Sequence, residues 1–466
     1  MDIKILGGKN EIGGNKILLE HKGTRIFLDF GMSFGESGKY FSEFVQPRKC
    51  GCLSDFFEFG LLPEQNGLYR EDYLKHMGLP PEKREVDAVL LSHAHADHAQ
   101  YIHFLRKDIP IFCTRESKII LEALENTGAS GFSDLVTYLE SFAFYENRNG
   151  GFSRVDRKKE EFVYDRDYVE MKPYEKYQIG SLEIEMLPVD HSLPGACGYI
   201  IYSDEGNLVY TGDIRFHGYV EEQSNEFVAR AKASSPRWMI SEGTRIDSDR
   251  IDSEEGVKKD ISAAISDAKG LVLIEHPIRD LYRAKSIYDA TRENGRDFIV
   301  GLKLAYLINL MGELSPFSIS DVKILIPRKK WGLISKESFD WPQVCQDYDK
   351  WEREFLDRDN SITFKNLKKN EDSFVLSMNL WSMNQLIDIR PKNALWIKSN
   401  CEPFNDDMEL DEQRKKNWLK HFNITQVSAH ASGHASGPEI RDMIKRINPE
   451  NLIPVHTEHP KLFKKN

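Results

Sequence analysis

The sequence has few cysteines and none of the cysteine spacings that build disulfide frameworks or zinc knuckles. Its six cysteines are scattered over 466 residues without a C-x-x-C pair. The closest two, Cys50 and Cys52, are separated by one residue, which is the wrong spacing for a zinc knuckle. We therefore expect reduced and mostly buried thiols, and we expect any metal site to use other ligands.

Long apolar runs and an excess of positive charge are missing as well. No stretch approaches the length of a membrane span, and the start of the chain lacks the basic and apolar segments of a secretory leader. We expect a cytoplasmic protein that makes no membrane contact. The net charge is −11, so a polyanionic partner would have to be held by a local basic patch or by bound metal.

The sequence does contain a dense histidine cluster. The apolar residues 89–91 predict a buried strand, and four metal-binding side chains follow it: His93, His95, Asp97 and His98. Because of their close spacing, a tight turn would aim all four inward, with a helix from Asp97 to about residue 105. Imidazole and carboxylate at this density lose solvation unless a cation gathers them, and these ligands suit Zn²⁺. The alternative, a solvated histidine-rich turn, fits an isolated histidine better.

Single acids and histidines stand near the ends of four more predicted strands. Asp29, His191, Asp213 and His456 each follow an apolar run. Each signal is weak alone, and Asp29 by itself would be an ordinary turn residue. Because functional side chains in layered α/β folds gather at strand ends, we expect these residues to meet the histidine cluster. The expected cage has one ion held by His93, His95 and His191, a second held by Asp97, His98 and His456, and Asp213 as the bridge.

A pair of divalent ions held in this way suits phosphodiester hydrolysis. Two neighbouring ions lower the pKa of a bridging water towards neutrality, and they neutralise the non-bridging oxygens of a phosphoryl group. The residues alone therefore predict a metal-dependent site that hydrolyses phosphodiesters.

The length and the rhythm of the chain predict two domains. A chain of 466 residues is too long for one compact core. The first part alternates strands, glycine turns and helices, whereas strand-helix-strand units from about residue 246 predict a second open sheet. The last 40 residues again show predicted strands that end in glycine-containing polar turns, as in the first part of the chain. Residues 127–178 show weak periodicity and are interpreted as an insertion.

The motifs together resemble the metallo-β-lactamase superfamily. Residues 93–98 with His191, Asp213 and Asp29 resemble its metal-binding signature. Three further segments resemble motifs A, B and C of its β-CASP branch: Ser241 with Glu242, the Ser-Gly-His at 432–434, and the Pro-Val-His at 454–456.

Within the β-CASP branch, the chain is most similar to ribonuclease J, especially its compact archaeal type. The similarity lies in the glycine-rich opening at 7–13 and in the Ser-Gly-His-Ala-Ser segment at 432–436. It implies an α/β fold in which an αββα metallo-β-lactamase sandwich, formed by residues 1–245 and 428–466, carries an inserted β-CASP α/β domain at 246–427.

The resemblance also implies a function. It implies a ribonuclease with two zinc ions that hydrolyses RNA phosphodiesters, mainly as a 5′-to-3′ exonuclease, with internal cleavage left open. It implies that His434 contacts the scissile phosphate or moves a proton, that Glu242 orients the motif histidines and that Asp97 takes part in catalysis. Asp29 would support the ligands. A histidine at motif C, here His456, is typical of RNA-directed members of the branch.

Contacts to single-stranded RNA are expected at two places. Exposed amides of the small-residue turn around His434 would cradle a phosphate, and an ordinary helix N-terminus is the alternative. The residues of this turn are Ser432, Gly433, Ala435 and Ser436. Arg279 and Arg283, on one helix predicted at 278–294, would line an RNA channel, and a solvated charged face is the alternative.

Two departures from the family pattern matter. Glu242 keeps the acid of motif A, but Gly-Thr-Arg follows it in place of the residues usual in bacterial enzymes, so recognition of a 5′-monophosphate on the RNA is left open. The chain stops ten residues after His456. We therefore do not expect the C-terminal dimerisation domain of the bacterial enzymes, and a homodimer formed in another way is left open.

Two other functions fit part of the pattern. A small-molecule hydrolase of the same superfamily would share the metal site, but the inserted domain would roof the crevice and suits a threaded strand better. A metal-free β-CASP scaffold that partners active nucleases should have lost ligands, and this chain keeps all seven.

Overall fold

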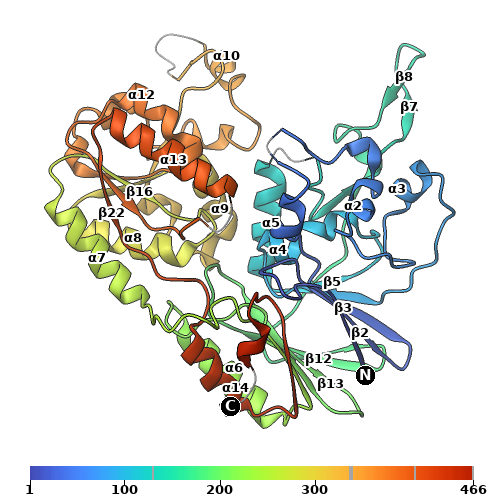
Figure 1. Ribbon diagram of the computed structural model, residues 1–466. Helices are drawn as coiled ribbons and strands as arrows, with labels where there is room; N and C mark the ends of the chain where they lie inside the picture. The colour runs from blue at the N-terminus through green and yellow to red at the C-terminus, as the bar shows by residue number, and fades with distance from the viewer. Residues whose placement is uncertain (43, 129–130, 335–339, 404–405, 464–466) are drawn as a thin grey trace.

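The strands of the protein form two α/β lobes that lie side by side (Figure 1). The computed structural model describes the chain except for residues 43, 129–130, 335–339, 404–405 and 464–466. None of the described helices combines the length and the apolar character that spanning a bilayer needs.

Two sheets packed face to face form the first lobe. Side chains from both sheets meet in a fully buried apolar core that includes Leu28, Ile184 and Tyr210. One sheet has the order β1 (Asp2–Gly7), β2 (Lys16–His21), β3 (Thr24–Leu28), β4 (Ala88–Leu90), β5 (Ile111–Cys113), β10 (Tyr168–Glu170). The other has the order β11 (Lys176–Ile179), β12 (Leu182–Pro188), β13 (Cys197–Tyr202), β14 (Leu208–Tyr210), β15 (Trp238–Ser241), β23 (Asn451–Pro454).

Helices cover both outer faces of this sandwich, which gives the expected αββα layers. α5 (Arg115–Thr127) begins at Thr114, whose hydroxyl accepts from the amide of Ser117, and packs on the first sheet. α14 (Gly437–Ile447) begins at Ser436, which forms a capping box with Glu439, and packs with α6 (Glu221–Ala233) on the second sheet. The shorter helices are α1 (Phe34–Gly38), α2 (Ser54–Glu58), α3 (Glu71–His76) and α4 (Ala96–Ala99), and the 3₁₀ turn η2 (Gln100–Phe104) continues α4.

The C-terminal end of segment 127–178 belongs to the sheets, so interpreting the whole segment as an insertion is wrong. β10 pairs in parallel with β5, and β11 pairs antiparallel with β12. Before these strands in the chain, β6 (Thr137–Leu139) pairs with β9 (Val163–Asp165), and β7 (Phe144–Glu146) pairs with β8 (Phe152–Arg154). These four strands lie outside the two main sheets.

The second lobe is an open parallel sheet with helices around it, as the strand-helix-strand rhythm predicts. Its order is β19 (Ser361–Ile362), β18 (Lys323–Leu325), β17 (Asp297–Val300), β20 (Phe374–Ser377), β16 (Val272–Glu275), β21 (Leu395–Lys398), β22 (Thr425–Ser428). The helix predicted at 278–294 is α8 (Leu281–Glu293), and Asp280 caps it. The other helices are α7 (Glu254–Asp267), which the sequence analysis missed, α9 (Leu302–Met311), α10 (Trp341–Cys345), α11 (Phe364–Leu367), α12 (Leu386–Ile389) and α13 (Asp406–His421).

A buried group of charged side chains joins the two lobes. Glu254, at the start of α7, accepts hydrogen bonds from Arg215 Nη1 at 3.1 Å and from Arg283 Nη2 at 2.5 Å. Arg215 lies in the loop after β14 and also pairs with Asp190, whereas Arg283 lies on α8 and donates to the carbonyl oxygen of Ala431. Burial alone would raise the pKa of Glu254, but the two guanidinium groups lower it to about 2.

The place of Arg283 contradicts one predicted RNA contact. Its side chain is only 1% exposed, and its guanidinium group is bonded to Glu254, Ser399 and Ala431. Arg283 therefore holds the lobes together and does not face a channel. A polar residue on an amphipathic helix predicts exposure by default, and only the tertiary partners of Arg283 show that it is buried.

Replacing Glu254 by Gln removes the negative charge between Arg215 and Arg283. We expect the free energy of unfolding to fall by about 3 kcal/mol, the size typical when one partner of a buried ion pair is removed. Glu255→Gln is the matched control, because the side chain of Glu255 is 67% exposed. Chemical denaturation followed by circular dichroism measures both variants, and equal stability would contradict the role of Glu254.

Candidate active site

The turn that follows β4 in the chain carries the histidine cluster, and hydrogen bonds to Asp29 hold this turn in place. The amide and the hydroxyl of Ser92 donate to the Asp29 carboxylate at 2.7 and 2.8 Å. His98 Nδ1 donates to Asp29 Oδ2 at 2.7 Å, and the hydroxyl of Tyr210 donates to the same oxygen at 2.5 Å. Because Asp29 accepts the proton on Nδ1 of His98, Nε2 of the same ring carries a lone pair that faces the site.

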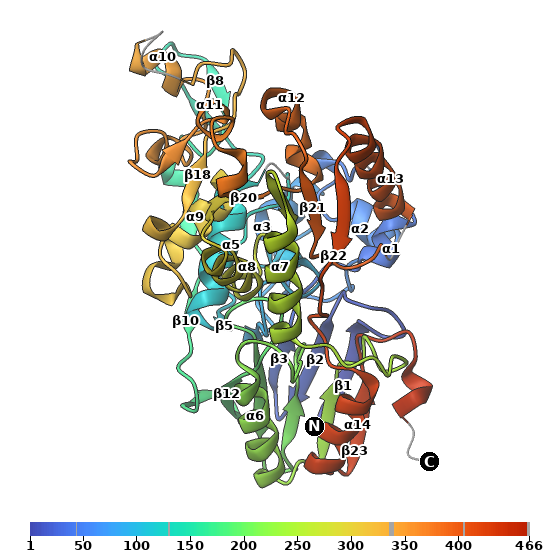
Figure 2. The same ribbon diagram turned by 90° about the vertical axis from the view of Figure 1, so that its left-hand side faces the viewer.

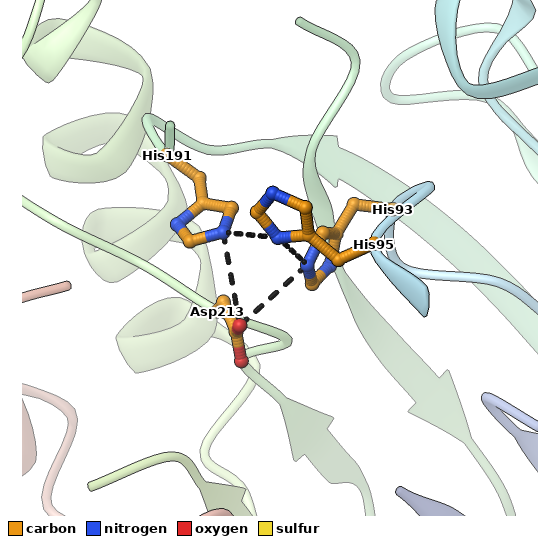
Figure 3. A group of neighbouring side chains, drawn as sticks. All are labelled: His93, His95, His191 and Asp213. Carbon is orange, nitrogen blue, oxygen red and sulfur yellow. Dashed lines mark hydrogen bonds and ion pairs between the residues drawn. The ribbon is translucent and has the colours of Figure 1, made fainter. Parts of the chain in front are cut away.

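Figure 3 shows the first group of ligands, in which three histidines surround one carboxylate. His95 Nδ1 lies 3.0 Å from His93 Nε2 and 3.1 Å from His191 Nε2. Asp213 Oδ2 lies 3.5 Å from His93 Nε2 and 3.7 Å from His191 Nε2. His191 Nδ1 donates to the carbonyl oxygen of Gly433 at 2.6 Å, which leaves the lone pair of Nε2 available for an ion.

A second group of ligands shares Asp213 with the first. His456 Nε2 lies 3.1 Å from Asp97 Oδ2, and His98 Nε2 lies 3.9 Å from the same oxygen. Asp213 Oδ2 is 3.3 Å from His98 Nε2 and 3.7 Å from His456 Nε2. The structure thus brings together all seven residues that the sequence analysis assigned to the cage, with Asp213 between the two sets.

The chemistry of these side chains fits bound metal. His98 Nε2 and Asp213 Oδ1 are buried and have no hydrogen-bond partner among the residues that the structure describes. Burial lowers the pKa of His93 and of His191, so both rings are neutral. Burial alone would raise the pKa of Asp213, but the rings of His456 and His98 lower it. Neutral imidazole and ionised carboxylate are the forms that bind metal.

His434 lies against the ligand groups and is held by Glu242. Burial alone would lower the pKa of His434, but Glu242 and then Asp213 raise it to about 9. His434 Nδ1 lies 3.1 Å from both carboxylate oxygens of Glu242 and 3.9 Å from Asp213 Oδ2. Glu242 is itself fixed, because it accepts from the amides of Ile214 and Thr244. The predicted pair of Glu242 and His434 is therefore a contact in the structure.

Further residues, which were not predicted as part of the site, hold the clustered side chains in place from behind. A Cβ atom on Gly31 would lie 1.7 Å from the carbonyl oxygen of Asp97, and one on Gly13 would lie 2.6 Å from Asp97 Oδ2. Thr244 Oγ1 lies 2.8 Å from His456 Nδ1. The two glycines stand in turns that are visible in the sequence, whereas no sequence pattern marks Thr244 as a partner of His456.

The small-residue turn before α14 uses its amides inside the protein. The amide of Ala435 donates to the carbonyl oxygen of Ile214 at 2.8 Å, and the amide of Ser436 donates to Glu439 Oε2 at 2.7 Å. Neither amide is free, which contradicts the predicted phosphate cradle at these two positions. The turn instead orients His191 and begins a helix.

A cleft of about 470 Å³ lies between the lobes. Ile120 and Leu124 line it from α5 of the first lobe, and Arg279, Trp381 and Lys415 line it from the second. Burial lowers the pKa of Arg279, and the Asp97 carboxylate offsets only part of this shift. Arg279 therefore lines the cleft, and its charge interacts with that of Asp97.

Comparison with known proteins agrees with this geometry. Residues 70–258 match the Beta-lactamase superfamily domain, and residues 422–464 match the Zn-dependent metallo-hydrolase RNA specificity domain. The chain is 23% identical to Ribonuclease J of Pyrococcus abyssi, over 98% of this chain and 89% of that protein. It is 22% identical to Ribonuclease J of Mycoplasma genitalium, over 98% of this chain and 68% of that protein.

The fold also matches a solved structure. A crystal structure of a protein of unknown function from Enterococcus faecalis V583 aligns with a TM-score of 0.73 and 22% identity, over 99% of this chain and 95% of that one. The expected resemblance to β-CASP ribonuclease J is confirmed, and so is the expected fold class, a metallo-β-lactamase αββα sandwich with a β-CASP domain.

Gly31→Ala should disturb the ligand turn without changing a ligand. The added methyl group would meet the backbone of Asp97, so the turn has to shift. We expect zinc affinity to fall about 10- to 100-fold, the range typical when the support of a metal ligand is lost. Competition with a chromophoric zinc chelator measures this affinity. Gly35→Ala is the control, because no atom lies within 4 Å of its Cβ position, and equal affinities would contradict the prediction.

Proposed function

We propose that this chain is a zinc-dependent ribonuclease of the ribonuclease J type, which hydrolyses RNA phosphodiesters and works mainly as a 5′-to-3′ exonuclease. The observation that carries the proposal is the position of Asp213, because Oδ2 of this residue lies within 3.9 Å of ring nitrogens from five histidines. Similarity to proteins named Ribonuclease J over 98% of the chain and the RNA specificity domain at 422–464 support RNA as the substrate.

Two zinc ions are the proposed cofactor. When bound, they would lower the pKa of a water molecule and neutralise charge on the phosphoryl group. The residues that would hold them are His93, His95 and His191 on one side and Asp97, His98 and His456 on the other, with Asp213 shared.

His434 is the proposed contact to the reacting phosphate. Glu242 engages Nδ1 of His434, so the ring is oriented and Nε2 is left to bind a phosphate oxygen or to give a proton to the leaving oxygen. Such a positioned acid contributes about 10²- to 10⁴-fold to a rate. Arg279, beside the same groups, would bind the RNA backbone through its charge.

We also propose that the chain divides into residues 1–245 and 428–466 for the metallo-β-lactamase domain and 246–427 for the β-CASP domain. Three strands support these limits. β15 ends at Ser241, β22 ends the second sheet at Ser428, and β23 returns to pair in parallel with β15.

The direction of cleavage is tested with RNA that carries a label at either its 5′ or its 3′ end. We expect mononucleotides from the 5′ end at the earliest times, and comparing 5′-monophosphorylated with 5′-triphosphorylated RNA measures any preference for the 5′ end. Discrete internal fragments at the start would show endonuclease action. Hydrolysis of a lactam or thioester without any cleavage of RNA would overturn the proposed function.

His434→Ala should lower the rate of RNA cleavage by at least about 100-fold, while the metal content stays that of the parent protein. Elemental analysis of the purified variant separates loss of catalysis from loss of metal. His459→Ala is the matched control, because the side chain of His459 is 48% exposed and pairs with Asp247 at the surface. Preserved activity in the His434 variant would remove its proposed role.

A further inference from the structure

The β7–β8 hairpin projects from the first lobe and joins neither main sheet (Figure 1). Phe144 lies opposite Arg154, and Glu146 lies opposite Phe152. Because residues two apart on a strand share a face, these four side chains lie on one face of the hairpin. All four are exposed, so this face has no partner among the residues that the structure describes.

Two large aromatic side chains dominate this face. The side chain of Phe144 is 63% exposed and that of Phe152 is 79% exposed. Single exposed apolar residues are common, but two on one face of a protruding hairpin indicate a contact surface. Aromatic rings presented in this way are the platforms on which proteins stack the bases of single-stranded nucleic acid.

The hairpin and the turn after it are basic, although the net charge of the chain is −11. Residues 144–159 contain two acidic side chains and five basic ones, Arg148, Arg154, Arg157, Lys158 and Lys159. Arg157 pairs with Glu125 and Asp134 and anchors the segment to the first lobe. The exposed side chains of Arg148, Arg154 and Lys158 make no ion pair within the described part of the chain. A local positive patch of this kind attracts a polyanion that the rest of the molecule repels.

An exposed aromatic side chain stands on the second lobe as well. Trp331 is 89% exposed and follows Arg328, Lys329 and Lys330, of which Arg328 pairs with Asp388 and Lys329 with Glu352. Lys330 Nζ donates to the carbonyl oxygen of Gln346 at 3.2 Å, which places this segment against the end of α10. Figures 1 and 2 both show α10 and β8 at the same end of the molecule. Both lobes therefore present exposed aromatic side chains at that end.

We propose that the β7–β8 hairpin is an RNA-binding arm that holds single-stranded RNA outside the catalytic cleft. Bases stack on Phe144 and Phe152, and Arg148, Arg154 and Lys158 contact phosphates. The inference rests on the proposed function, since it assigns a second contact for the same substrate. Stacking and phosphate contacts do not distinguish the hydrogen-bonding edges of the bases, so the arm does not select a sequence. It favours long substrates, because only these extend from the cleft to the hairpin.

Two variants test the arm. The aromatic variant carries Phe144→Ser and Phe152→Ser. The charge variant carries Arg148→Gln, Arg154→Gln and Lys158→Gln. We expect the aromatic variant to raise the Kd for an unstructured RNA of a few dozen nucleotides at least about tenfold, since two stacked bases are lost. We expect the charge variant to reduce the slope of log affinity against log salt by about 2, because three phosphate contacts to a single strand are lost. Fluorescence anisotropy across a salt series measures both quantities.

Two controls separate the arm from the catalytic site. The hairpin residues belong neither to the ligand groups nor to the lining of the cleft. Both variants should therefore cleave RNA of a few nucleotides at the parental rate, which also shows that they fold. Lys445→Gln with Arg446→Gln removes two exposed charges from α14, at the opposite end of the molecule from the hairpin. This variant should bind long RNA like the parent protein.

The outcomes are distinct. If the parent protein cleaves RNA and both hairpin variants bind long RNA with parental affinity, the hairpin is not an RNA-binding arm. The proposed function stands in that case. If the parent protein neither binds nor cleaves RNA, the proposed function fails and the arm fails with it. If the aromatic variant changes only the oligomeric state in sedimentation velocity, the hairpin is a protein interface and the proposal is overturned.

Discussion

Five imidazole rings gathered around one carboxylate oxygen form the interaction on which the rest of the structure depends. The side chain of Asp213 is 1% exposed, and Oδ2 lies 3.3 to 3.9 Å from ring nitrogens of His93, His98, His191, His434 and His456. A carboxylate removed from water in this way costs several kcal/mol unless cations or donors surround it. Bound metal would meet that requirement, and Asp213 Oδ1 and His98 Nε2 have no hydrogen-bond partner in the described structure.

Backbone strain at two strand ends helps to create this arrangement. Asp29 and His456 both have left-handed backbones, with φ of 57° and 51°, which residues other than glycine seldom adopt. Contacts from other strands impose the conformation, because the amide of Asp29 donates to the carbonyl oxygen of Leu90 and the amide of His456 donates to that of Gly8. Strain of this kind persists where the surroundings determine the backbone, and it gathers at functional sites.

The sequence predicts which side chains gather around Asp213 because part of their signal is local. A predicted strand followed by a turn is enough to identify His93, His95 and His98. The end of an apolar run is enough to identify His456. The burial of Arg283 and the engaged amide of Ala435 depend on partners that are distant in the chain, Glu254 and Ile214. Sequence patterns therefore identify the clustered histidines and acids, but they do not tell a buried arginine from an exposed one, or a bonded amide from a free one.

The segment at 431–433 couples the ligand groups to the junction between the lobes. The carbonyl oxygen of Ala431 accepts from Arg283, that of Ser432 accepts from Arg215, and that of Gly433 accepts from His191. Three successive carbonyl groups thus contact the second lobe, the junction and a metal ligand in turn. A shift of the second lobe would have to move or break these bonds, so the width of the cleft and the orientation of His191 are not independent. Because coupling between two binding events is reciprocal, a polymer that bound across both lobes would stabilise this same arrangement of side chains.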